Sequence, residues 1–392
     1  MLLTQTSCHS YRSSEAEFIR NIVEWISKLI YHNSFVGISS RVEEMNSYLD
    51  MESNDIRFIG ICGMRGMGKT TLAKVVFDRI HHKFEACSFL ENVREFSKDP
   101  HGLKRLQYQL LHDMKLNSEG DLEMGTQVIR NRLSNKSVLI VVDDVSKTRQ
   151  LENLVGKPNW FGPRSRIIIT TEDEHLLANY QVHMGFSKKQ DITICKVKGL
   201  NNDEALQLFK QKAFHRHPCQ NDLKDLCNDF VNYAQGNPLV LEVLGAFLSD
   251  KTSKREWDSA LSQLNAVPNG KTIEKLKIAF NVLDSMEREL FLDISCFFNG
   301  EDRNRVADIL ESVCYSHINI RSLNDKSLIT IVGEKLWMHN LLQQMGWDYV
   351  HEKQEPRKYS RLWLRDDVLD VLKNNIVSGL LYRNKFREVY NL

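Results

Sequence analysis

Short hydrophobic runs alternate with amphipathic stretches along the first half of the chain. Five runs rich in Val, Ile or Phe are almost unbroken by charge, at 56–62, 87–93, 137–142, 166–171 and 192–197. Strands that are buried on both faces have this composition. Helical patterns lie between the runs, at 69–82, 101–115 and 124–134. The alternation predicts a doubly wound parallel α/β sheet.

Helical patterns dominate after residue 199, where the strand-like runs nearly stop. Four helices are predicted, at 202–213, 223–234, 239–248 and 256–264. A second helical region covers roughly 273–350 and holds one hairpin, with arms at 328–332 and 335–339 joined by Gly333-Glu334. Helices followed by a hairpin predict a winged-helix domain. At the other end of the chain, an apolar stripe at 15–31 predicts a linker helix after a polar lead that is expected to be disordered.

A glycine-rich motif follows the first predicted strand. Residues 63–70 match G-x-x-x-x-G-K-[ST], and the helical pattern after them is the context that a phosphate-binding loop requires. Glycines let backbone N–H groups converge on phosphate oxygens, and the helix N-terminus adds the positive end of its dipole. We expect Lys69 to reach the β- and γ-phosphates and the Thr70 hydroxyl to bind Mg²⁺. The predicted nucleotide contacts here are Gly63, Met64, Gly66, Met67, Gly68, Lys69, Thr70 and Thr71.

Two acidic residues end the third predicted strand, about 70 residues after the loop. A buried strand places them at the carboxyl edge of the sheet, where ligands bind in open α/β folds. Asp143 fits a role in binding Mg²⁺ through water, and Asp144 is a candidate for activating an attacking water. Thr170 and Thr171 end the fourth strand at the same edge. They either hydrogen-bond near the γ-phosphate or simply favour the strand.

Composition narrows the class of protein. Lys plus Arg is 52 and Asp plus Glu is 51 in 392 residues, so no global charge favours nucleic acid or anionic lipid. None of the eight cysteines belongs to a C-x-x-C or zinc pattern, which indicates reduced thiols. No run approaches the ~18 apolar residues of a membrane span, and no secretory signal pattern is present. A cytoplasmic or nucleocytoplasmic location is expected.

These motifs, in this order, resemble the NB-ARC nucleotide-binding domain of plant disease-resistance proteins, which are STAND P-loop NTPases. Further segments that carry the resemblance are 35–38 (FVGI), 89–95 (FLENVRE), 236–239 (GNPL), 291–298 (FLDISCFF) and 338–340 (MHN). The FLDISCFF segment, and the lack of a Trp soon after Asp144, are typical of the class whose full-length members begin with a TIR domain. The resemblance extends from residue 15 to about residue 375.

The resemblance implies a molecular switch in plant defence signalling. ADP is held between three units in the off state, and exchange for ATP swings the winged helix outward and permits self-association or association with full-length receptors. Val36 and Gly37 would contact the adenine side of the nucleotide. Pro238 would pack against the base or ribose, and His339 would reach the β-phosphate from the winged helix. A His on a mobile domain supplies the differential contact that a nucleotide-driven movement needs.

Domain boundaries follow from the resemblance. They are 1–34 for the lead and linker helix, 35–198 for the P-loop domain, 199–272 for a helical domain (ARC1), 273–375 for the winged helix (ARC2) and 376–392 for a tail. No TIR pattern precedes residue 15 and no leucine-rich repeat pattern follows residue 375, so the chain is interpreted as a truncated receptor, an alternative product or a gene fragment.

Two positions depart from the family pattern. Thr-Thr-Arg is usual at the end of the fourth strand, where the Arg senses the terminal phosphate, and here that position is Glu172. Either Glu172 points away or sensing and hydrolysis are impaired, because an acid ~4 Å from a polyphosphate repels it by about 1–4 kcal/mol. Arg164 or Arg166 could take the place of this phosphate-sensing Arg only from the opposite end of the strand. Asn340 replaces the usual Asp, which is expected to weaken the closed ADP state.

Four functions stay open from the sequence. The first is a nucleotide-dependent signalling switch that is at most a slow ATPase. The second is an active AAA-like ATPase, which the intact loop and acidic pair favour and Glu172 opposes. The third is a nucleic-acid-binding winged-helix ATPase, which the non-basic turn at Gly333-Glu334 opposes. The fourth is a non-signalling truncated regulator of full-length receptors.

Overall fold

The computed structural model describes residues 35–115, 125–186, 191–215, 221–265, 272–311, 317–351, 361–362 and 369. The predicted lead and linker helix at 1–34 and the tail at 376–392 lie outside these residues. Two compact units divide the chain, Met1–Leu200 and Asn201–Leu392. Among the described helices, none is both long enough and apolar enough to cross a bilayer.

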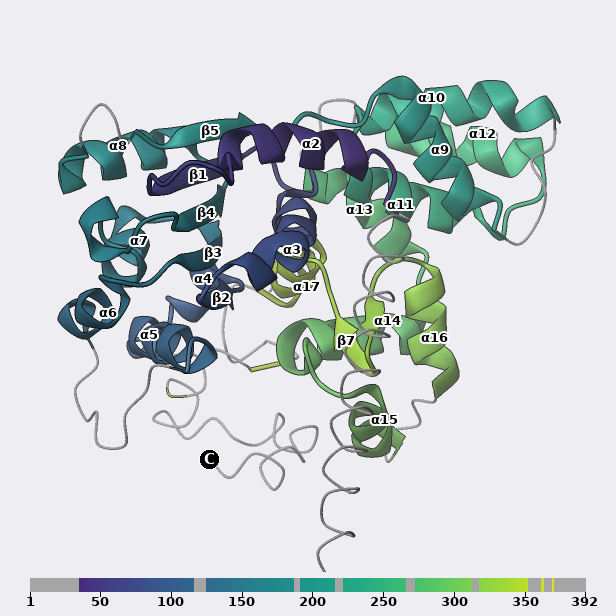
Figure 1. Ribbon diagram of the computed structural model, residues 1–392. Coiled ribbons are helices and arrows are strands. Elements are labelled where there is room, and N and C mark those ends of the chain that lie inside the picture. The colour runs from purple at the N-terminus through teal and green to yellow at the C-terminus, as the bar shows by residue number, and fades with distance from the viewer. Residues whose placement is uncertain are drawn as a thin grey trace, which may run out of the picture. The chain divides into compact units, whose positions relative to one another are not determined.

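Five parallel strands form the sheet of the first unit, in the order β2-β3-β4-β1-β5 (Figure 1). They are β1 (Arg57–Cys62), β2 (Ala86–Leu90), β3 (Val138–Val145), β4 (Arg166–Thr171) and β5 (Thr193–Lys196). Each predicted hydrophobic run overlaps one of these strands. The predicted doubly wound parallel sheet is therefore confirmed.

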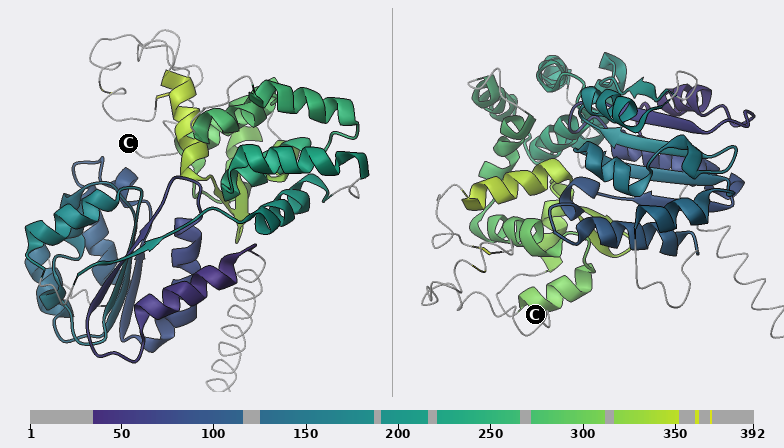
Figure 2. Two further views of the ribbon diagram at one scale, coloured as in Figure 1. Left: turned by 90° about the horizontal axis from the view of Figure 1, so that it is seen from above. Right: turned by 90° about the vertical axis from the view of Figure 1, so that its left-hand side faces the viewer.

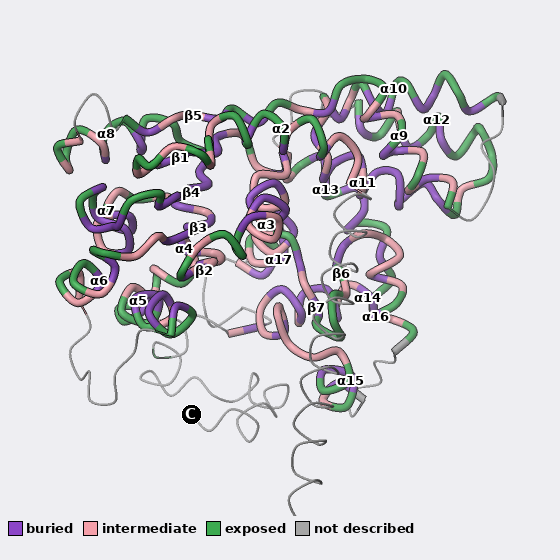
Figure 3. The backbone as a smooth tube through the Cα atoms, viewed as in Figure 1, coloured by how far each residue is buried: buried purple, intermediate pink, exposed green. Residues whose placement is uncertain are grey.

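Helices cover both faces of this sheet (Figure 2). On one face, α2 (Ile38–Leu49) and α3 (Lys69–Ile80) pack against Ile59 and Ile168 of the strands. The neighbouring strand residues Phe58 and Ile167 point to the other face, as the period of two in a strand requires. That face is covered by α5 (Gly102–Asp113), α6 (Thr126–Leu133), α7 (Thr148–Leu154) and α8 (Glu174–Met184). Figure 3 shows the result, in which buried strands lie between helices whose outer sides are exposed.

Arg166 is a structural residue of the first unit. Its side chain is 1% exposed, although it stands at the first position of β4. The guanidinium donates to the backbone carbonyl of Leu49 (2.6 Å) at the end of α2, to those of Asp50 (2.7 Å), Ser53 (3.0 Å) and Asp55 (2.6 Å) between α2 and β1, and to that of Ser165 (3.0 Å) just before β4. Because all of these acceptors lie at the amino edge of the sheet, Arg166 cannot substitute for a phosphate-sensing Arg at the carboxyl edge. Arg164 also faces that edge, where it donates to the carbonyl of Met51 at 3.5 Å.

The second unit begins with four helices, α9 (Asn202–Ala213), α10 (Lys224–Ala234), α11 (Pro238–Leu248) and α12 (Lys254–Asn265). Asn201 and Glu204 form a capping box at the start of α9, because each side chain accepts the backbone N–H of the other. The buried rings of Phe209, Phe230 and Trp257 pack against one another in the core of this group. All four helices agree with the sequence prediction.

A second group of elements follows, and it contains the predicted hairpin. The elements are α13 (Thr272–Asn281), α14 (Ser285–Asp293), a π-helix (Ile294–Phe298), α15 (Arg303–Glu311), α16 (His317–Asp325), β6 (Thr330–Val332), β7 (Lys335–Trp337) and α17 (Asn340–His351). β6 and β7 pair antiparallel around Gly333 and Glu334, whose φ angles of 54° and 68° give the left-handed turn that two-residue hairpins favour. On α17, Gln343 and Trp347 both donate to the carbonyl of Ser295 in the π-helix, at 2.9 and 2.8 Å.

Candidate nucleotide-binding site

The loop at 63–70 joins β1 to α3 and has the backbone of a phosphate-binding loop. Gly66 and Gly68 have φ angles of 77° and 84°, a region that residues with a Cβ rarely adopt. A Cβ at Gly63 would lie 3.0 Å from the carbonyl oxygen of Val197 on the neighbouring segment. The three glycines of the motif are therefore fixed by backbone geometry, which curls the loop in front of the N-terminus of α3.

Lys69 lies inside the curl of this loop. Its ammonium donates to the carbonyls of Gly63 at 2.8 Å and Met64 at 2.9 Å. Burial lowers the pKa of Lys69, and the carboxylates of Glu172, Asp144 and Asp143, in that order, oppose the shift. The ammonium of Lys69 is thus held where phosphate oxygens would meet the loop.

Asp143 gathers the hydroxyl groups of two segments. Thr70 Oγ1 donates to Asp143 Oδ1 at 2.8 Å, and Thr170 Oγ1 donates to the same oxygen at 2.7 Å. Asp143 is 1% exposed, and burial raises its pKa, while the two hydroxyl bonds act in the opposite direction. Hydroxyl and carboxylate oxygens are the donors that Mg²⁺ accepts in proteins. The structure therefore brings the predicted metal ligands Thr70 and Asp143 together in a set that fits this ion.

Asp144 occupies an unusual backbone position that the sequence did not predict. Its φ is 59°, and the register of β3 against β4 shifts between Val142 and Val145. Its backbone N–H donates to Thr170 Oγ1 at 2.8 Å, so the Thr170 hydroxyl is used both as donor and as acceptor within the sheet edge. The carboxylate lies 3.0 Å from Arg94 Nη2. Burial is the largest effect on Asp144 and raises its pKa, although Arg94 acts in the opposite direction. The role of Asp144 in activating water stays a prediction.

Glu172 faces the loop and does not point away from it. Its Oε1 accepts from Arg65 Nε at 2.7 Å and from Arg94 Nη2 at 2.8 Å. Of the two sequence-based alternatives for Glu172, the first is therefore wrong. Arg65 and Arg94 are residues of the site that sequence reasoning missed. Arg65 occupies an unspecified position of the loop motif, and only its opposite charge to Glu172 could have signalled the pair.

The segment before α2 lies on the same face of the sheet as the loop. Val36 and Gly37 precede α2, and the φ of 71° at Gly37 turns the chain into the helix. The next residue, Ile38, is buried in the same core as Met67 of the loop. Thr71 stands in the first turn of α3. The adenine contacts that the family resemblance assigns to Val36 and Gly37 stay predictions.

Pro238 and His339 belong to the second unit. Pro238 is the first residue of α11, and the Asn237 side chain caps that helix by accepting from Val240 N–H at 3.3 Å. His339 immediately precedes α17, and its Nδ1 accepts from the backbone N–H of Leu341 at 3.1 Å. The imidazole is thereby oriented by the start of the helix. The nucleotide contacts assigned to both residues stay predictions.

Substituting Asp143 by asparagine should separate magnesium binding from folding. We expect Mg²⁺-dependent nucleotide affinity to fall about 10–100-fold, because a charged partner of the ion is lost. The free energy of unfolding without nucleotide should rise. Burial raises the pKa of Asp143, so its carboxylate costs stability above that pKa, and the cost is relieved as the pH falls through it. Titration calorimetry and urea unfolding test both parts.

The control for this variant is Asp173→Asn, which changes the same charge close to the site. Asp173 caps α8 by accepting from His175 N–H, and asparagine preserves that cap. Nucleotide affinity should stay within about twofold in the control. Unchanged affinity in the Asp143 variant would contradict the assigned role.

Comparisons with known protein families agree with this geometry. The model of the NB-ARC domain matches residues 38–219. The model of the winged-helix domain of Disease resistance protein Roq1-like sequences matches residues 284–354. The second match covers α14 through α17 and includes the confirmed hairpin.

Relatives and solved structures extend the comparison. Disease resistance protein RUN1 of Vitis rotundifolia is 43% identical over 84% of this chain, and TMV resistance protein N of Nicotiana glutinosa is 37% identical over 94%. The chain spans 24% and 32% of the length of these two relatives. A Pyrococcus horikoshii protein, described as a Signal Transduction ATPase with Numerous Domains with a tetratricopeptide repeat sensor, gives a TM-score of 0.46 at 17% identity, over 86% of this chain and 49% of that one. That likeness is partial and says nothing of function. From the two domain matches and the resistance-protein relatives, the chain carries an NB-ARC domain followed by a Roq1-like winged-helix domain.

Proposed function

We propose that this chain binds ADP or ATP with Mg²⁺ and works as the nucleotide-dependent switch of a cytoplasmic plant immune receptor. One observation supports nucleotide binding above the others: Thr70 of the loop and Asp143 of β3 meet at 2.8 Å. The loop supplies backbone N–H groups and Lys69 for phosphates, and this oxygen pair supplies a place for the ion that accompanies them.

The immune role is supported by the relatives, two of which are named for disease resistance and resistance to TMV. The switch role requires contacts that differ between the two nucleotide states. Pro238 and His339 are the residues of the second unit proposed to make them. His339 suits this role because its side chain is exposed and its Nδ1 accepts from the backbone N–H of Leu341 in α17, which orients the ring.

Hydrolysis is proposed to be slow. Asp144, the proposed base, is paired with Arg94 at 3.0 Å, so its carboxylate has to leave this ion pair before it can accept a proton from water, although burial keeps its pKa above the ordinary value. The bound nucleotide then persists long enough to define a state of the switch. None of the described contacts favours a rapid ATPase or a nucleic-acid interface over this reading.

The nucleotide carried by the purified chain tests the proposal. We expect chromatography of the denatured protein to release ADP in a ratio near one per chain, and Mg²⁺ chelation before purification to lower that ratio. Light scattering should then show self-association after exchange into ATP and a smaller species in ADP. A chain that carries no nucleotide and releases phosphate rapidly from added ATP would refute the switch.

A further inference from the structure

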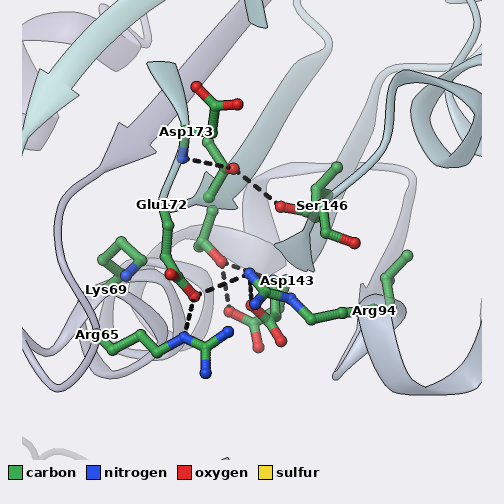
Figure 4. Close-up of polar contacts among 12 residues, drawn as sticks. Arg65, Lys69, Arg94, Asp143, Ser146, Glu172 and Asp173 are labelled. Atoms are coloured by element: carbon green, nitrogen blue, oxygen red, sulfur yellow. Dashed lines mark hydrogen bonds and ion pairs between the residues drawn. The ribbon is translucent and has the colours of Figure 1, made fainter. Parts of the chain in front are cut away.

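Four charged side chains form a compact group beside the loop, here called the Glu172 cluster: Arg65, Arg94, Asp144 and Glu172. Figure 4 shows Arg65 and Arg94 approaching the Glu172 carboxylate from two sides. One oxygen, Glu172 Oε1, accepts from both guanidinium groups, at 2.7 and 2.8 Å, and Arg94 also reaches Asp144 at 3.0 Å. Both arginines are therefore bound, through the same carboxylate, to the end of β4.

The position of the cluster makes it part of the phosphate site. Arg65 is a residue of the loop itself, and Glu172 follows β4, which pairs with β1 up to Cys62 and Thr171. The side chains of Arg65 and Glu172 are 36% and 31% exposed, so solutes can reach them. Among the charges that act on Lys69, that of Glu172 raises its pKa most. The field of Glu172 thus reaches the cation of the loop.

Guanidinium groups bind carboxylate and phosphate oxygens with the same donors. The two arginines held by Glu172 are therefore the groups that a terminal phosphate at this edge would use. Among the residues that the structure describes, none accepts from the buried Nε of Arg94. A terminal phosphate that displaced the Glu172 carboxylate would find this further donor on Arg94, which is shielded from solvent as the side chain now lies.

We propose that Glu172 determines which phosphate chain the site prefers. Its carboxylate occupies Arg65 and Arg94 and places a negative charge beside the loop, so a nucleoside diphosphate binds in preference to a triphosphate. A diphosphate leaves the Glu172 cluster intact. A third phosphate competes with Glu172 for the same two guanidinium groups and is repelled by it. This inference rests on the proposed nucleotide binding.

Glu172→Gln tests the inference, because it removes the charge and keeps the shape. Calorimetric titration of the full chain with MgADP and with the Mg²⁺ complex of a non-hydrolysable ATP analogue gives the two affinities. We expect the variant to bind the triphosphate about tenfold more tightly and the diphosphate within about twofold of the original. Adding Arg65→Ala to this variant should remove the gain. Glu172→Ala gives an independent second variant if the first proves unstable.

Glu174→Gln is the matched control. Glu174 lies two positions further along the chain and pairs with Lys196 at 2.7 Å, away from the two arginines. The Glu174→Gln variant should leave the affinities for the diphosphate and the triphosphate unchanged. If the original chain binds both nucleotides and Glu172→Gln leaves their ratio unchanged or lowers triphosphate affinity, the inference is wrong while the proposed function stands. If the original chain binds neither nucleotide, the proposed function itself fails.

Discussion

Replacing Lys69 by alanine is expected to lower adenine nucleotide affinity by about 100-fold. Hydrogen bonds to charged groups contribute about 1.5–3 kcal/mol each, and this ammonium is the one loop group proposed to donate to two phosphates. In the structure it lies 2.8 Å from the carbonyl oxygen of Gly63 and 2.9 Å from that of Met64. When phosphates bind, the ammonium therefore exchanges these two carbonyl acceptors for phosphate oxygens, and the Lys69 side chain does not have to become newly ordered. Equilibrium titration with MgADP measures the loss.

Two further variants make this result specific. Lys83→Ala removes the same charge from an exposed position beyond the far end of α3 and should leave affinity unchanged. Lys69→Arg keeps the charge but replaces a compact ammonium by a planar fork, so it should recover only part of the affinity. If Lys69→Ala retains nucleotide at the original level, the loop is not part of the nucleotide-binding site.

Replacing Arg166 by methionine is expected to lower the free energy of unfolding of the first unit by about 3–5 kcal/mol. Methionine fills a similar volume but donates no hydrogen bond, so the five backbone carbonyls that accept from the buried guanidinium lose this donor. The loss is a large fraction of the 5–15 kcal/mol typical of a whole domain. Urea unfolding followed by circular dichroism measures it.

Arg164→Gln is the control for that experiment. Arg164 is exposed, two positions earlier, and makes one long bond to the carbonyl of Met51 at 3.5 Å. Its loss should change the unfolding free energy by less than about 0.5 kcal/mol. Equal effects of the two substitutions would mean that the carbonyls around Arg166 find other donors.

The sheet and the loop were predictable from the sequence because their signals are local. Buried parallel strands need unbroken apolar runs, and the motif at 63–70 is contiguous, so both can be recognised without knowing what packs against them. The helices α2, α7 and α8 were not predicted. They are short or have mixed faces, and the sheet determines where they begin and end.

The polar network of the site was predicted only in part. Asp143 was placed correctly because a buried strand delivers it to the sheet edge. The partners of Glu172 could not be predicted, because Arg65 and Arg94 are 107 and 78 positions away from it. The left-handed backbone at Asp144 likewise depends on a register shift between β3 and β4 that leaves no mark in the sequence. Arg166 looked like a candidate sensor by residue type, and burial showed it to be part of the framework.

The order of the strands has a consequence for how the first unit folds. β1 is flanked by β4 and β5, the two strands furthest from it along the chain, and β2 joins the sheet only through β3. The loop therefore gains its neighbours Asp143 and Glu172 only after more than half of the unit has been synthesised. Closing such long-range contacts is slow and costs chain entropy. A ligand that binds only the completed edge, at a free concentration 100 times its Kd, would add about 2.7 kcal/mol to the stability of the whole sheet. Nucleotide in the cell would therefore favour the finished fold over its late intermediates.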